Sequence, residues 1–155
     1  MTSMPKTTFC WSDAWVLAAT AVGGGLQGAQ LKEIVAAGDL INRTLFTPRE
    51  LRIAFAKLIH AGHVVQMGER YVIAGDARAA VVDALQEAFT SFSVMQFFED
   101  FLASEPYGSA DRPGDDEEWP FEQLTDAMVE LACAEYRAEA SKLGSEVAES
   151  ARLRE

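Results

Sequence analysis

Apolar residues recur every three or four positions through residues 48–61, and this spacing predicts an amphipathic helix. Thr47, Pro48 and Glu50 mark its start, because they supply a hydroxyl cap, a proline for the first turn and a carboxylate three residues after the cap. Gly62 marks its end. The expected inner face holds Leu51, Ala54, Phe55, Leu58 and Ile59, and the expected outer face holds Arg49, Arg52, Ala56, Lys57 and His60.

Two short runs, residues 64–67 and 70–73, flank the pair Gly68-Glu69 and predict a β-hairpin. Glycine in the first position of the pair suits a type II′ turn. Alternation along the strands assigns Val64, Gln66, Tyr71 and Ile73 to one face, and Val65, Met67, Arg70 and Val72 to the other. Because a lone hairpin is marginally stable in water, we expect it to pack on helices.

Two further helices are expected ahead of residue 48. The first covers residues 13–22, with Ser12 as its cap and Asp13 in its first turn, and the second covers residues 30–41. The glycines of residues 23–28 match G-x-G-x-x-G, which binds dinucleotides when it lies between a strand and a helix. Here a helix is expected before the glycines, so the pattern favours a turn, with Leu26 as a candidate for a third short strand.

The second half of the chain is expected to be helical. One helix begins at Asp76, and a capping box at Ser93 suggests a break before a second. Their aromatic residues predict either a core under the last helix or an interface or cleft, and they are Phe89, Phe92, Phe97, Phe98 and Phe101. Residues 105–118 are expected to form an acidic linker. A last helix is expected from Trp119 to about Leu143, with a frayed or disordered tail after Gly144.

Charge divides the 155-residue chain into two unlike halves. The net charge is −11, yet residues 1–75 carry +2 and residues 76–155 carry −13. The first half could therefore approach a phosphate backbone, which the second half would repel. Cys10 and Cys133 are too few for a disulfide framework or a zinc site, so a cytoplasmic location is the default expectation. The apolar run of residues 14–22 is about half the length of a membrane span.

Three helices followed by a hairpin, with a basic outer face on the third helix, resemble the winged helix-turn-helix family over residues 12–74. The likeness to small bacterial regulators of the PadR and MarR kind is architectural. It implies a mainly α fold with one small β-hairpin, made of a winged-helix-like domain at residues 9–75 and an acidic helical region at residues 76–155. It also implies that helix 48–61 enters a major groove, with residues 67–70 as the wing. The DNA-binding residues would then be Arg49, Arg52, Lys57, His60 and Arg70.

The leading hypothesis is a DNA-binding transcriptional regulator that acts as a homodimer on double-stranded DNA. The alternative is a non-enzymatic protein-interaction module, in which the winged helix is a scaffold and the acidic half binds a basic partner. A third hypothesis, a nucleotide-dependent enzyme, rests on residues 23–28 alone. No serine elbow, Walker loop or zinc motif is present in the sequence, so no catalytic residue, cofactor or metal is expected. No membrane partner is expected either.

Overall fold

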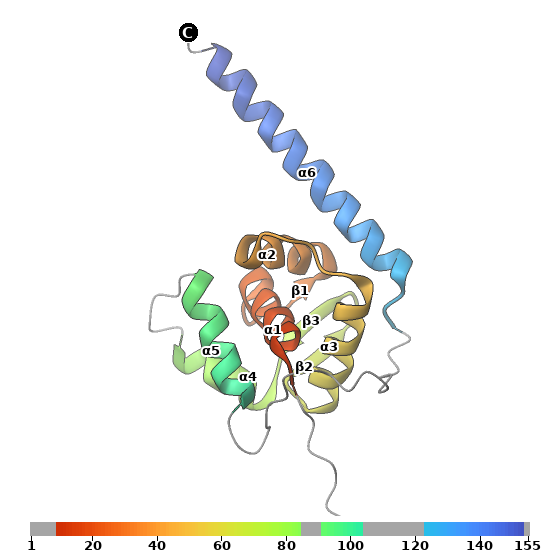
Figure 1. The fold of residues 1–155 in the computed structure, drawn as a ribbon, viewed down its shortest axis with the longest axis vertical. Coiled ribbons are helices and arrows are strands. Elements are labelled where there is room, and N and C mark those ends of the chain that lie inside the picture. Colours follow the sequence, from red (N-terminus) through yellow and green to blue (C-terminus); the bar gives the residue numbers. More distant parts are fainter. Residues whose placement is uncertain (1–8, 85–90, 104–122, 154–155) are drawn as a thin grey trace, which may run out of the picture.

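The computed structural model describes residues 9–84, 91–103 and 123–153. Within these ranges the protein is mainly helical with a small antiparallel sheet, so the expected fold class is confirmed (Figure 1). The elements in chain order are α1 (Trp11–Gly24), β1 (Ala29–Gln30), α2 (Leu31–Asn42), α3 (Pro48–His60), β2 (Val64–Met67), β3 (Arg70–Ile73), α4 (Gly75–Ala84), α5 (Ser91–Ala103) and α6 (Asp126–Leu153).

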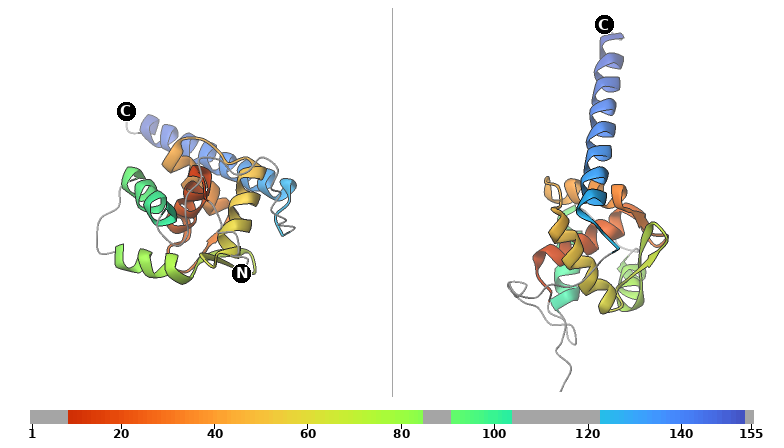
Figure 2. Two further views of the ribbon diagram at one scale, coloured as in Figure 1. Left: turned by 60° about the horizontal axis from the view of Figure 1, so that its bottom comes forward. Right: turned by 90° about the vertical axis from the view of Figure 1, so that its right-hand side faces the viewer.

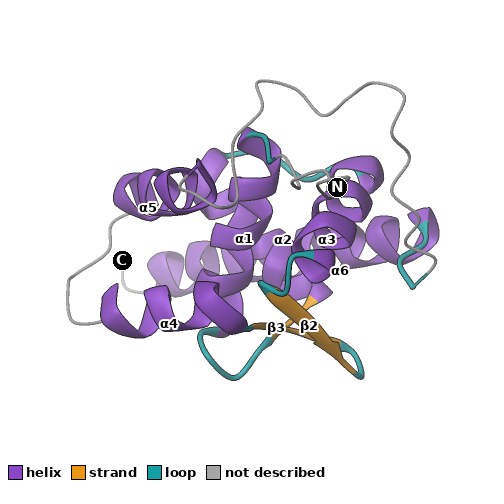
Figure 3. Cartoon of the chain, turned by 90° about the horizontal axis from the view of Figure 1, so that it is seen from below, coloured by secondary structure: helices purple, strands orange, loops and turns teal. Residues whose placement is uncertain are grey.

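The sheet has the strand order β1-β3-β2, with antiparallel pairing throughout, and lies along one side of the helical body (Figure 3). The hairpin is confirmed, with Met67 opposite Arg70 and a φ of 62° at Gly68 in the turn. Its two faces are as expected, since Val64, Tyr71 and Ile73 are buried. The third strand forms at Ala29–Gln30 rather than at Leu26, because α1 continues to Gly24, two residues past its expected end, and Leu26 lies in the turn that follows.

Local caps decide where the first helices begin. Thr47 and Glu50 form the expected capping box of α3, with Thr47 Oγ1 accepting from the Glu50 amide at 3.2 Å. The expected Ser12 cap of α1 was wrong, because the helix begins two residues earlier than predicted and its cap residue is Cys10. The Asp13 carboxylate accepts a hydrogen bond from the Cys10 amide at 2.8 Å, so it stabilises that start.

Helix α1 lies at the centre of the molecule and packs against α2, α3 and α5 (Figure 1). Every residue from Asp13 to Thr20 is buried. The Trp15 ring contacts Phe46 with centroids 3.9 Å apart, and its Nε1 donates to the Gly38 carbonyl at 3.0 Å. A Cβ on Gly38 would collide with the Phe46 ring, so α2 approaches this cluster closely only because residue 38 is glycine. The apolar run that is too short for a membrane span is therefore the central core helix.

The C-terminal helices share this core. Phe98 is buried, and Phe97 and Phe101 are partly buried against the same cluster, which confirms an intramolecular core for these three aromatic residues. The expected position under the last helix was wrong, because α5 packs against α1 and α2. Phe89 and the Phe92 side chain lie outside the described residues, as do the expected acidic linker and the start expected at Trp119. No helix among the described residues is long and apolar enough to cross a membrane. Because α4, α5 and α6 contribute to the cluster, one continuous core spans the expected boundary at residue 75.

Helix α6 begins at Asp126, where Thr125 Oγ1 accepts from the Met128 amide at 3.2 Å. It packs on α2 and α3 and then continues away from the body (Figures 1 and 2). The helix runs through Gly144 to Leu153, so the end expected at about Leu143 was wrong. The 28 residues span about 42 Å at the usual rise per residue.

We expect His63 to make the fold sensitive to acid. The side chain is buried between Phe9 and Phe101, and burial lowers its pKa from the ordinary 6.5, while the charge of Asp76 acts in the opposite direction. As the pH falls, His63 is therefore protonated in the unfolded chain before it is protonated in the folded chain. The stability is full above about pH 6.5 and falls as the pH is lowered.

The measurement is urea unfolding between about pH 7 and pH 5, where one proton can contribute a slope of at most about 1.4 kcal/mol per pH unit. His63→Gln should flatten this slope. An equal slope in the wild type and His63→Gln would contradict the assignment.

Candidate nucleic-acid interface

The five residues expected to contact DNA do not form one exposed surface. Arg49, His60 and Arg70 are exposed, Arg52 is one-third exposed, and Lys57 is buried. The inner face of α3 is confirmed, since Leu51, Ala54, Phe55 and Leu58 are buried and Ile59 is partly buried.

The expected outward position of Lys57 was wrong. Its Nζ lies 2.9 Å from Asp13 Oδ2, and the two side chains are only 2% and 1% exposed. Asp13 already turns inward to accept from the Cys10 amide, so its carboxylate is in place where α1 crosses α3. Ala56 is buried as well. The part of α3 available to a partner is therefore narrower than the periodicity indicates.

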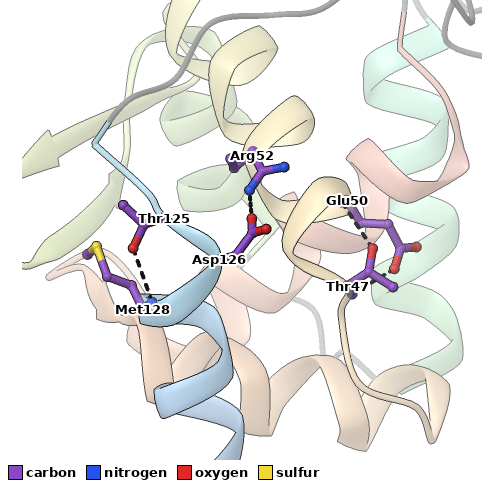
Figure 4. Close-up of polar contacts among 6 residues, drawn as sticks. All are labelled: Thr47, Glu50, Arg52, Thr125, Asp126 and Met128. Carbon is purple, nitrogen blue, oxygen red and sulfur yellow. Dashed lines mark hydrogen bonds and ion pairs between the residues drawn. The ribbon is translucent and has the colours of Figure 1, made fainter.

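Arg52 is also engaged, because it forms an ion pair with Asp126 at the start of α6 (Figure 4). The close-up shows the first turns of α3 and α6 side by side, each with its own capping interaction. A DNA phosphate that approached Arg52 would be repelled by the Asp126 carboxylate unless that carboxylate were displaced. The sequence pattern did not indicate Asp126, because it predicted that the last helix begins earlier, at Trp119.

Two further exposed arginines, Arg70 and Arg78, also make contacts within the chain. Arg70, at the hairpin, donates to the Gly28 carbonyl at 3.1 Å and has Glu33 at 3.9 Å, so it is held against the start of α2. Arg78 was not among the expected contacts. It is exposed and donates to the carbonyls of Leu26 and Ile73 at 2.9 and 3.4 Å. Both side chains thus brace the glycine turn and the sheet.

The described residues offer no group of three or more His, Cys, Asp or Glu side chains placed to hold a metal ion. Cys10 and Cys133 are free thiols. Burial raises the pKa of both, with the Asp13 charge adding to the effect at Cys10, so neither is activated as a thiolate nucleophile. The glycine turn follows helix α1 and leads into an antiparallel strand, which differs from the context of a dinucleotide fingerprint.

Comparison of the chain with protein-family models, with curated proteins and with solved structures finds no match. The geometry described above is therefore the basis for assigning a function.

Breaking the buried ion pair should cost much of the stability of the fold. Lys57→Met leaves the Asp13 carboxylate buried without its cation, and Asp13→Asn leaves the ammonium without its anion, so each should lower the free energy of unfolding by about 3–5 kcal/mol. Denaturant unfolding of the two single variants and the double variant measures this, and the double variant should lose less than the sum of the singles.

Lys32→Met is the control, because Lys32 forms its ion pair with Glu139 at the surface. This substitution should lower the free energy of unfolding far less than Lys57→Met does. Additive effects of Lys57→Met and Asp13→Asn would show that the two side chains are not coupled.

Proposed function

We propose that this chain is a non-enzymatic protein-interaction module built on a winged-helix scaffold, and that it associates with a second copy of itself through α6. The element order of residues 12–74, with three helices, a short first strand and a hairpin, supports the scaffold. The projecting α6 is the observation that carries the functional part of the proposal.

Among the described side chains, polar contacts with the body are found in the first half of α6. Arg52 pairs with Asp126, Tyr136 Oη donates to Asp39 Oδ2 at 2.6 Å, and Lys32 pairs with Glu139 at 2.7 Å. Fourteen residues of the helix follow Glu139, and their ribbon extends away from the other elements (Figure 2). A helix of this length is marginal in water unless something packs against it. The projecting half therefore favours a partner.

The sequence of α6 favours another copy of α6 as that partner. Small or apolar residues follow at alternating spacings of four and three, and they are Val129, Cys133, Tyr136, Ala140, Leu143 and Val147. This is the spacing of a coiled-coil seam. The first part of the seam is used inside the protomer, since Val129 is buried and Cys133 is partly buried. Its continuation lies beyond the contacts with the body and suits a second helix.

The charge around α3 makes DNA reading the weaker hypothesis. Lys57 is removed from the surface, Arg52 has a carboxylate beside it, and the whole chain carries −11. Exposed Arg49 and Arg70 favour DNA as a second candidate, because they occupy the start of α3 and the hairpin. Those positions correspond to a recognition helix and a wing in the proposed scaffold.

Shortening α6 should abolish self-association without unfolding the protein. A chain ending at Lys142 keeps Asp126, Tyr136 and Glu139 with their partners, so it should remain helical. Sedimentation velocity over a range of concentrations should find a dimer for the full chain and a monomer for the shortened one. Val147→Lys on the seam should weaken the dimer, whereas Ser145→Lys, which lies off the seam, should not. A full chain that stays monomeric at every concentration would refute the proposed partner.

Fluorescence anisotropy with a random-sequence duplex separates the proposal from DNA reading. We expect weak binding at most, with a dissociation constant no better than about 0.1 mM at about 0.2 M salt. Under the proposal, Asp126→Asn, which releases Arg52, and Arg49→Ala should both bind the duplex as weakly as the unchanged chain does. Tight, salt-dependent binding that Arg49→Ala weakens and Asp126→Asn strengthens would instead establish the DNA reader.

A further inference from the structure

A groove lies where the start of α2, the hairpin tip and α6 meet. Its volume is about 290 Å³, and its walls include Gln30, Gln66, Tyr71, Leu131 and Glu135. Concave sites at the junction of separate elements are common positions for small ligands, and this volume is at the lower end of their usual range. The groove lies outside the α3 surface considered for DNA and consists of described residues.

Tyr71 supplies the first sign of a ligand. The residue is 2% exposed and stacks on Phe55 with ring centroids 4.1 Å apart, so its ring is fixed. Tyr71 is one of the residues that line the groove, and its buried hydroxyl makes no hydrogen bond within the described part of the chain. A buried hydroxyl without a partner destabilises a fold by about 1–3 kcal/mol. A ligand with a polar atom would remove that penalty.

The α6 wall supplies the second sign. Leu131 is 60% exposed and Met128 is 44% exposed, although both lie beside the buried Ala132 on the same groove. Neighbouring large apolar side chains that face solvent in a concave site favour a flat apolar ligand. Methionine adds a polarisable sulfur that suits contact with an aromatic ring.

Charge restricts the class of ligand further. Glu69 and Glu135 contribute carboxylates to the walls, whereas the basic side chain there, Lys32, is held by Glu139 at 2.7 Å. The local field therefore disfavours an anionic ligand and favours a cationic one. Gln30 and Gln66 add amide donors and acceptors that accommodate a neutral polar group.

We propose that this groove binds a small planar aromatic molecule that carries a cationic or neutral polar group, with its ring against Met128 and Leu131 and a polar atom hydrogen-bonded to the Tyr71 hydroxyl. The site is independent of the proposed self-association, because Met128 and Leu131 are not on the α6 seam. Binding should therefore be retained in the chain ending at Lys142.

A series of indoles of similar size tests the charge preference with the full chain. Tryptamine is cationic, tryptophol is neutral and indole-3-acetate is anionic, while all three present the same ring. Isothermal titration calorimetry should find saturable binding of tryptamine with a dissociation constant of about 1 mM or tighter, and about tenfold weaker binding of indole-3-acetate. Absence of saturable binding for both tryptamine and tryptophol, or preference for the anion, would overturn the proposal.

Substitutions in the groove wall locate the site. Tyr71→Phe should weaken tryptamine and tryptophol binding by about two- to tenfold through loss of one hydrogen bond, while the free protein unfolds at the same or a higher temperature. Thr20→Val is the control, because it removes a buried hydroxyl that donates to the Val16 carbonyl within α1, outside the groove, and it should leave binding unchanged. Leu131→Ser, at an exposed position, should weaken binding without unfolding the chain. Unchanged affinity in both Tyr71→Phe and Leu131→Ser would show that the indoles bind elsewhere.

Discussion

The buried ion pair between Lys57 and Asp13 determines how the first half of the molecule is assembled. Two charges can stay in a dry core only if each neutralises the other, so α1 and α3 have little freedom to slide past one another. The Asp13 carboxylate also holds the Cys10 amide, so the start of α1 and the middle of α3 depend on one side chain. The same pair limits function, because it takes the central cation of α3 away from any partner.

The position of α6 depends on a different kind of interaction. Val129, together with Leu124 just before the helix, is buried in the core. Polar contacts to Arg52, Asp39 and Lys32 determine the direction of α6 along α2 and α3. Carboxylates of the acidic half therefore meet cations of the basic half within one chain. The opposite charges of the two halves thus form ion pairs within the chain. This weakens the inference that the basic half binds the phosphates of DNA.

Local sequence signals predicted those features of the fold that depend on neighbouring residues. Thr47, Pro48 and Glu50 specify the start of α3, and Gly68 specifies the hairpin turn, because each acts within a few residues of itself. Periodicity could divide α3 into faces, but it could not show that Asp13, 44 residues away, meets Lys57 on the outer one. The contact of Asp126 with Arg52 and the groove around Tyr71 likewise arise where distant segments pack together, so they required the three-dimensional structure.

The central position of α1 affects how the chain must fold during synthesis. Helix α1 is made before the other described elements, yet one of its packing partners, α5, comprises residues 91–103 and leaves the ribosome much later. Until then the apolar side of α1 that α5 covers lacks its native neighbour. Contacts between such distant segments slow folding and prolong the exposure of apolar surface. The nascent protein is thus most vulnerable to aggregation while its future core is already outside the exit tunnel and still incomplete.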